Sequence, residues 1–332
     1  MRKISNNAIR SLSRPVRDVY DQRNFQPDDA EVGIEIECEG ESLHFDMDEY
    51  WDIHEDGSLR GESAEYVLSG PINRTEVAPA LRYLDDKFLD NGSEFSDTYR
   101  TSVHVHLNVQ GRTITQVINQ ICLYTIFEDL LVEFCGKDRI GNLFCLRISD
   151  AENTIDAIRR AITRNDWYSL THDTHRYSAI NVTALGKYGS LEFRSFRGTT
   201  DIELINTWVN ILLDIYDSAK MYTNPQEICS ELSILGAKAF IEKTFSAQNA
   251  ALLLDFANYG ARLMRGVRLA QDIAYCTDEW NQPAPEYVPE FNIIEDAQPV
   301  DMQEQFDRLR VMMARQPYFI IDDNIDDDEE FA

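Results

Sequence analysis

Residues 33–39 read Gly-Ile-Glu-Ile-Glu-Cys-Glu, with an acidic side chain at every second position from residue 35. Two later stretches alternate in the same way: residues 102–108 read Ser-Val-His-Val-His-Leu-Asn, and residues 190–197 read Ser-Leu-Glu-Phe-Arg-Ser-Phe-Arg. A period of two is typical of a β-strand with one apolar and one polar face. If the three strands share a sheet, its polar face carries carboxylates, imidazoles and a guanidinium in adjacent rows. This pattern predicts a place that holds metal ions and phosphates.

The row of Glu35, Glu37 and Glu39 is electrostatically costly in a cleft. Same-face neighbours on a strand lie roughly 7 Å apart. Two carboxylates at that distance repel by about 0.6 kcal/mol in water and by about 2.4 kcal/mol at an effective dielectric constant of about 20. Mg²⁺ would neutralise such a row, since it takes carboxylate and phosphate oxygens as ligands. A solvated strand face is the alternative for this row alone, and the two later stretches argue against it.

Composition limits the classes of function. The chain has 332 residues, 43% of them hydrophobic, and a formal net charge of −27. Broad nucleic-acid binding is not expected, because so acidic a surface repels a phosphate backbone. The six cysteines are dispersed without a CxxC pair, and there is no secretory signal and no apolar run of eighteen residues. We therefore expect reduced thiols, no membrane span and a cytoplasmic location.

The order of strand-like and helical segments predicts an α+β fold. Strands are expected at 32–39, in a meander over 43–68 and in the two later alternating stretches. Helices are expected at 76–89, 115–134, 151–163 and 201–222, then over 225–274 and 300–314. Strand pairs with short connections favour a mainly antiparallel sheet, with helices packed on one face and the polar residues lining the other.

Six short motifs occur in an order that resembles the amidoligase family of the glutamine synthetase / γ-glutamylcysteine ligase superfamily. The motifs are Gly33–Glu37, Asp56–Leu59, Glu65–Ser69, Ser102–His106, Arg139–Asn142 and Leu191–Arg194. The resemblance covers about residues 32–200 and implies a glutamine synthetase-like catalytic domain. It also implies an ATP-dependent carboxylate–amine ligase, in which ATP phosphorylates a carboxylate and an amine attacks the acyl phosphate to give an amide. Phosphoryl transfer depends mainly on positioning and on stabilisation of charge by metals and cationic side chains, which agrees with the polar face described above.

The resemblance implies specific roles for residues of these motifs. It implies two or three Mg²⁺ ions, which Mn²⁺ could replace, with the metal ligands Glu35, Glu37, Glu65, His104 and Glu192. Implied nucleotide-binding residues are His104, His106, Arg139, Asn142 and Arg194. Implied catalytic residues are Asp56, Arg176, Arg194 and Arg197. Asp56 would position or deprotonate the amine, although Asp-Gly also favours a turn without any function.

Further residues border these motifs. Arg176 and Asn181 match a family segment that borders the acyl substrate. Before its first histidine the glutamine synthetase group usually has glycine, where this chain has Ser102 and Val103, so the approach of the main chain to the nucleotide would differ. Glu65 could instead be a surface residue of a hairpin.

The chain divides into four expected segments: an N-terminal arm at 1–28, the amidoligase catalytic domain at 29–224, a helical region continuous with it at 225–318, and an acidic tail at 319–332. The expected partners are small-molecule or peptide carboxylates and amines, with no membrane and no broad nucleic-acid binding. Contacts through sheet edges or the helical region would be compatible with a homo-oligomer.

Two other functions stay open. A zinc-dependent hydrolase could use His104, His106 and a carboxylate, because an HxH pair is a common ligand arrangement. Against it, no third histidine and no HExxH helix accompanies the pair. A non-catalytic acidic interaction protein on the ligase scaffold is the third candidate.

Overall fold

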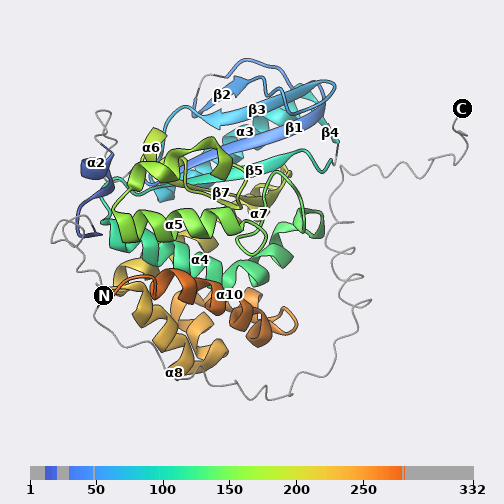
Figure 1. Ribbon diagram of the computed structural model, residues 1–332. Coiled ribbons are helices and arrows are strands. Elements are labelled where there is room, and N and C mark those ends of the chain that lie inside the picture. The colour runs from blue at the N-terminus through green and yellow to red at the C-terminus, as the bar shows by residue number, and fades with distance from the viewer. Residues whose placement is uncertain (1–11, 21–29, 48, 97, 279, 281–332) are drawn as a thin grey trace, which may run out of the picture. The chain divides into compact units, whose positions relative to one another are not determined.

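The computed structural model describes residues 12–20, 30–47, 49–96, 98–278 and 280, and shows an α+β fold built on one antiparallel sheet (Figure 1). The strands are β1 (Val32–Glu41), β2 (Trp51–His54), β3 (Ser63–Leu68), β4 (Glu94–Ser96), β5 (Ser102–Asn108), β6 (Ile180–Asn181) and β7 (Ser190–Arg197). They pair in the order β2-β3-β1-β5-β7-β6, and β4 pairs with the end of β1. The predicted sheet of antiparallel strands is confirmed.

The helices predicted at 76–89, 115–134, 151–163 and 201–222 are present, and the helical stretch predicted over 225–274 consists of three helices. Two four-residue helices, Val16–Val19 and Ala184–Lys187, were not predicted. The helices of the described residues are α2 (Val16–Val19), α3 (Val77–Asn91), α4 (Ile114–Cys135), α5 (Glu152–Arg164), α6 (Ala184–Lys187), α7 (Ile202–Ser218), α8 (Pro225–Thr244), α9 (Ala247–Leu254) and α10 (Tyr259–Ala274). Helix α3 ends at Gly92, whose φ of 63° is a left-handed C-cap. Helix α7 begins at Asp201, whose carboxylate accepts hydrogen bonds from the main-chain amides of Glu203 and Leu204.

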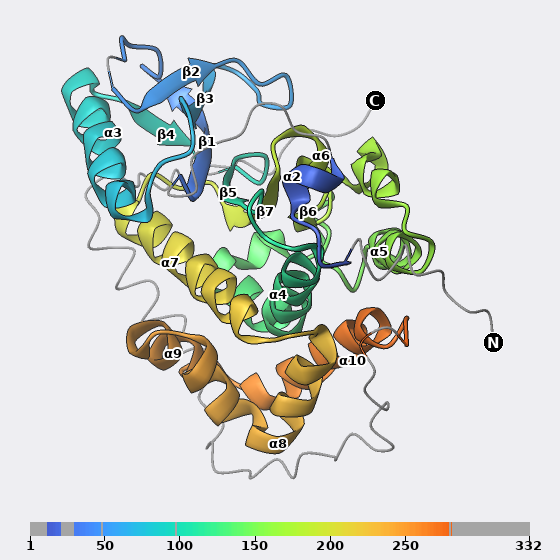
Figure 2. The same ribbon diagram turned by 90° about the vertical axis from the view of Figure 1, so that its left-hand side faces the viewer.

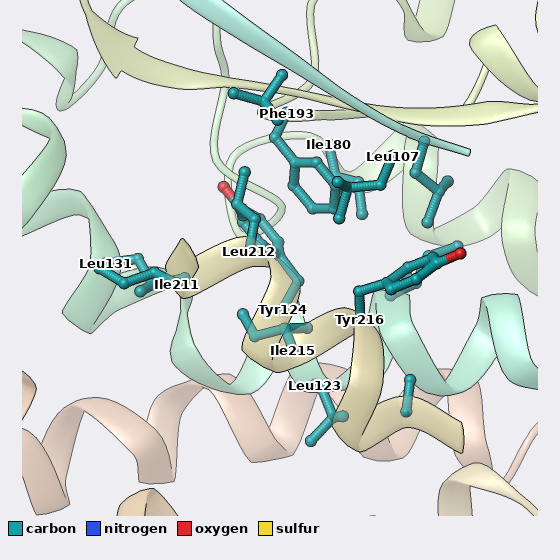
Figure 3. Packing of buried hydrophobic residues seen from close by; sticks show 14 of the residues in the cluster. Leu107, Leu123, Tyr124, Leu131, Ile180, Phe193, Ile211, Leu212, Ile215 and Tyr216 are labelled. Atoms are coloured by element: carbon teal, nitrogen blue, oxygen red, sulfur yellow. The ribbon is translucent and has the colours of Figure 1, made fainter. Parts of the chain in front are cut away.

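One face of the sheet is apolar and packs on two helices. Helices α4 and α7 lie along this face, and α8 and α10 pack on the far side of α4 (Figures 1 and 2). Figure 3 shows Phe193, Leu107 and Ile180 of the sheet opposite Tyr124 of α4 and Leu212 of α7. Burying a large apolar side chain contributes about 1.5–3 kcal/mol, so this face supplies much of the stability that holds the strands in place.

Strand β7 does not alternate along its whole length. Its pairing with β5 shifts between Val103 and Val105, whose partners are Phe196 and Phe193. The partners differ by three positions on β7 and by two on β5, which defines a β-bulge with one extra residue on β7. Both phenylalanines therefore lie on the helix-covered face, where Phe196 stacks on Trp208 and Phe193 packs on Tyr124.

The structure differs from the expected meander at its start. Residues 43–45 form no strand, because side chains take up the main-chain groups of Leu43: its amide donates to Glu62 (2.9 Å), and its carbonyl accepts from the Tyr66 hydroxyl (2.6 Å). Strands β4 and β6 were not predicted, and each has three residues or fewer. They are too short to show a period.

The ends of the chain are described only in part. Within the expected N-terminal arm, Leu12, Val16 and Tyr20 are buried in the core. Residues 1–11 and 21–28 of that arm, the helix expected at 300–314 and the tail at 319–332 lie outside the described residues. All described residues belong to one compact unit, residues 1–293, and the four domain boundaries stay predictions. Among the described helices, none has the length and apolar character of a membrane span.

Candidate active site

Three cross-strand pairs gather polar side chains on the face of the sheet opposite α4 and α7. The register partners are Glu37 with Glu65, Glu35 with His104, and His106 with Glu192. Residues directly opposite in an antiparallel pair have Cβ atoms about 5 Å apart. The order β3-β1-β5-β7 therefore turns three separate sequence motifs into one continuous cluster.

Ser102 links the first two pairs. Its hydroxyl lies 2.5 Å from Glu37 Oε2 and 2.7 Å from His104 Nε2. The other ring nitrogen of His104, Nδ1, lies 3.0 Å from Glu35 Oε2. Only 3% of the His104 side chain and 5% of the Glu37 side chain are exposed, against 23% for Glu35. Of the two carboxylates, Glu35 is therefore the more accessible to an incoming group.

His106 lies on the β7 side of the cluster. Its Nδ1 is 3.0 Å from the Ser190 hydroxyl, and its Nε2 is 3.3 Å from Glu35 Oε1 and 3.9 Å from Glu192 Oε2. The Nε2 atom is buried and makes no contact of hydrogen-bond geometry with either carboxylate. Because a buried polar nitrogen needs a partner, this atom has the capacity to bind a further group.

Glu192 is held from two sides. One carboxylate oxygen is paired with Arg194 and the other accepts a hydrogen bond from Asn181 Nδ2 (2.6 Å). Arg194 also donates from Nε to the Phe144 carbonyl (3.4 Å), which ties the strand to the loop after α4. The guanidinium thus borders the carboxylates, where it could meet an anionic substrate group.

Asp56 and Glu65 close the cluster on the β3 side. One oxygen from each of Asp56, Glu37 and Glu65 lies within 4.8 Å of the others. The turn orients Asp56, since its carboxylate accepts a hydrogen bond of 2.5 Å from the Ser58 amide. Burial, together with the charges of Glu35, Glu37 and Asp56, raises the pKa of Glu65 to about 7.

The charges of the cluster are strongly coupled. Burial favours the neutral form of Glu35, but its interactions with His104 and His106 outweigh burial and hold the pKa of Glu35 well below its usual range. Glu192 is similar: burial opposes ionisation, and Arg194 and the two histidines lower its pKa. The pKa of His106 rises because the neighbouring carboxylates outweigh burial. Because their pKa values are lowered, Glu35 and Glu192 are anions at neutral pH.

The donor set fits a divalent cation that accepts oxygen and nitrogen ligands. Three groups each bring their ligand atoms within 4.8 Å of one another: Glu35 with Glu65 and His104, Glu35 with His106 and Glu192, and Glu37 with Asp56 and Glu65. Each has at least two carboxylates and at most one histidine, which suits Mg²⁺ or Mn²⁺ better than a histidine-rich zinc site. In the second group, the buried Nε2 of His106 faces both carboxylates.

Four residues expected in the site contact other parts of the described structure. Arg139 is only 1% exposed, and its guanidinium donates to main-chain carbonyls of residues 101, 194 and 195. Asn142 donates to the Tyr99 carbonyl (3.1 Å). Arg176 is exposed over Tyr177, and Arg197 donates to the Phe134 carbonyl at the end of α4 (3.4 Å). The described contacts of these four residues do not include the carboxylate cluster.

Sequence reasoning missed two contributors to the cluster. Ser102 was noted only for standing where glycine was expected, and Ser190 was not singled out. Both carry a hydroxyl at the end of an alternating stretch and in phase with its histidine or glutamate. That phase is the signal that could have identified them.

A family model described as "Putative amidoligase enzyme" matches residues 51–216, which is half of the chain. The matched range contains β2, β3, β5 and β7 and begins after β1. Glu35 and Glu37 are placed beside the matched strands by the pairing of β1 with β3 and β5. No curated protein and no solved structure matches the chain.

Proposed function

This chain belongs to the amidoligase family, and on that premise we propose that it is an ATP- and Mg²⁺-dependent carboxylate–amine ligase of the glutamine synthetase / γ-glutamylcysteine ligase superfamily. The observation that carries the proposal is the convergence of Glu35, His104 and Glu192, from three strands, in one buried cluster. Its His104 Nδ1 atom lies 3.0 Å from Glu35 and 3.8 Å from Glu192. A merely solvated strand face would not bury these groups.

The reaction has two steps. A carboxylate oxygen of the acid substrate attacks the γ-phosphorus of ATP, so that ADP leaves and an acyl phosphate forms. The amine nitrogen then attacks the acyl carbon, the phosphate leaves with the C–O bonding electrons, and the amine loses a proton. The acid and amine would be small molecules or peptides.

Residues of this chain have separate tasks in that scheme. Arg194 would bind the transferred phosphoryl group or the substrate carboxylate, since its guanidinium suits both oxyanions. Asp56, oriented by the Ser58 amide, would accept the proton of the amine. Glu35, Glu37, Glu65, His104 and Glu192 would hold the metal. When bound, Mg²⁺ would supply positive charge to the phosphate oxygens.

Hydroxylamine trapping tests this function. The protein, ATP and Mg²⁺ are incubated with a panel of carboxylic acids and hydroxylamine, which converts an acyl phosphate to a hydroxamate. We expect hydroxamate and ADP in equal amounts with at least one acid. Glu37→Gln should abolish both products, and Glu41→Gln, at the exposed end of the same strand, should not. No hydroxamate across a broad panel would count heavily against the proposal.

The two alternatives make other predictions. A zinc hydrolase would retain zinc through purification, but no candidate ligand group among the described residues contains more than one histidine. A non-catalytic interaction protein would show no thermal shift with ATP and Mg²⁺. Elemental analysis and a thermal melt distinguish all three functions.

A further inference from the structure

Strand β6 consists of two residues, and the second is the register partner of a candidate metal ligand. Ile180 pairs with Phe193 and Asn181 pairs with Glu192. Both Asn181 and Glu192 are 5% exposed. Since paired residues of antiparallel strands project to the same face, this short strand presents the Asn181 amide to the Glu192 carboxylate.

The orientation of the Asn181 amide is determined by its neighbours. Its Oδ1 accepts hydrogen bonds from the Thr183 main-chain amide (2.9 Å) and from the Thr183 hydroxyl (2.7 Å). A main-chain N–H can only donate, so the atom facing it must be the amide oxygen. The NH₂ group therefore faces Glu192, and Nδ2 donates to Glu192 Oε2 at 2.6 Å.

This hydrogen bond directs Glu192 toward the two histidines. With Oε2 held by Asn181, Oε1 pairs with Arg194 and lies 3.8 Å from His104 Nδ1. Oε2 itself lies 3.9 Å from His106 Nε2. Without the amide, Glu192 would be held from the Arg194 side only, and its carboxylate could rotate away from His106.

We propose that Asn181 is a positioning residue, which holds the Glu192 carboxylate in the rotamer that faces His104 and His106. This proposal rests on the proposed function, because it takes Glu192 to be a metal ligand of the ligase. It replaces the expectation that Asn181 borders the acyl substrate. Partners that orient a metal ligand tune metal affinity although they do not touch the ion.

Metal binding by the full chain in the absence of substrates gives the first test, with Mn²⁺ alone as the probe. Asn181→Asp keeps the shape of the side chain and the acceptor for Thr183. It replaces the NH₂ group beside Glu192 by a carboxylate oxygen, which cannot donate a hydrogen bond. We expect it to weaken Mn²⁺ binding about tenfold or more, in line with the loss of other partners that orient metal ligands. Asn181→Ala, which adds no charge, should weaken binding by a smaller factor. Thr183→Val is the matched control, since it retains the main-chain donor, and should change binding less than twofold.

A crystal structure of the Asn181→Ala protein gives a second readout that does not depend on metal or turnover. We expect the Glu192 carboxylate to leave its wild-type rotamer. An unmoved Glu192, unchanged Mn²⁺ affinity in Asn181→Asp, or an equal loss in Thr183→Val would overturn the positioning role. If the wild-type protein binds no Mn²⁺, the metal site of the proposed function fails, and the rotamer of Glu192 still decides the role of Asn181.

Discussion

The same strands form both faces of the sheet, but the two faces have opposite effects on stability. On the face toward α4 and α7, alternate residues such as Leu107 and Phe193 are fully buried among apolar side chains. On the other face, their sequence neighbours, the half-buried His106 and the buried Glu192, lie among charges. Burial of apolar surface favours folding, whereas burial of ionised groups opposes it unless they are paired. Burial of the apolar face therefore offsets the free-energy cost of burying ionised groups on the polar face.

The largest effect should follow from damage to the apolar face. Phe193→Ala removes a fully buried ring that packs 5.1 Å from the Tyr124 ring, centroid to centroid. Truncation of a buried phenylalanine costs about 3–5 kcal/mol, so we expect the free energy of unfolding to fall by that amount in urea denaturation. A loss below about 1 kcal/mol would mean that the two faces do not differ as described.

Glu128 is a carboxylate on the mainly apolar side of the sheet, and its titration should make the free energy of unfolding depend on pH. This carboxylate on α4 is buried, and burial raises its pKa to about 8, although the Ile148 amide donates to it (2.8 Å). Between pH 4.5 and 8 the native state keeps a proton that the unfolded chain has lost. The free energy of unfolding should therefore fall as pH rises through this window, by about 3–4 kcal/mol from this group.

Glu128→Gln should remove that pH dependence, because the amide oxygen still accepts from Ile148 and carries no charge. Urea denaturation at pH 4.5, 6 and 8 gives the measurement. We expect the variant to match the wild type at pH 4.5 and to exceed it increasingly toward pH 8. A constant difference across the window would show that Glu128 titrates normally.

Substitution on the polar face should lower turnover without lowering the free energy of unfolding, in contrast to substitution on the apolar face. Glu37→Gln removes a carboxylate that faces Glu65 across the strand pair. We expect turnover to fall about 100-fold or more, which corresponds to about 2.7 kcal/mol of activation free energy. The free energy of unfolding should stay unchanged or rise, since like charges are no longer buried together. Kinetics and urea denaturation on the same preparation separate the two effects, and a variant that lost stability while keeping its turnover number would contradict the account.

A pair of buried serines gives the smallest and most closely matched comparison. Ser102 bonds Glu37 and His104 on the polar face, and Ser195 bonds the Tyr124 hydroxyl (2.7 Å) on the helix side. Ser102→Ala should lower kcat/KM about tenfold with little change in stability. Ser195→Ala should cost about 1 kcal/mol in urea denaturation and leave kcat/KM unchanged. Equal effects on activity would show that the faces are not functionally distinct.

Alternation in the sequence predicted the three strands that carry the polar residues and the sharing of one face by these residues, and short connections predicted the antiparallel sheet. Strand period is a local property, so Glu35, His104 and Glu192 could be assigned to strands without knowledge of their neighbours. Which strand lies beside which is not local. The pairing of β1 between β3 and β5, which brings Glu37 to Glu65, needed the structure.

The arginines show what sequence alone does not distinguish. Arg194 and Arg139 both stand in motifs, but Arg194 pairs with Glu192, whereas Arg139 donates to carbonyls that the fold brings near it. Nothing local distinguishes the two, because a long side chain finds its acceptors only after the chain has folded. The β-bulge of β7 had a trace in the sequence, where Ser195 and Phe196 interrupt the alternation that ends at Arg194.

We propose that the carboxylates and imidazoles of the polar face form one site for a metal–nucleotide complex. Electron paramagnetic resonance of Mn²⁺, titrated into the protein with and without ATP, tests it most directly. We expect bound Mn²⁺ in the wild type and tighter binding with ATP, loss of both in Glu37→Gln, and retention of both in Glu41→Gln. Free Mn²⁺ throughout the wild-type titration, or the same affinity in both variants, would contradict it.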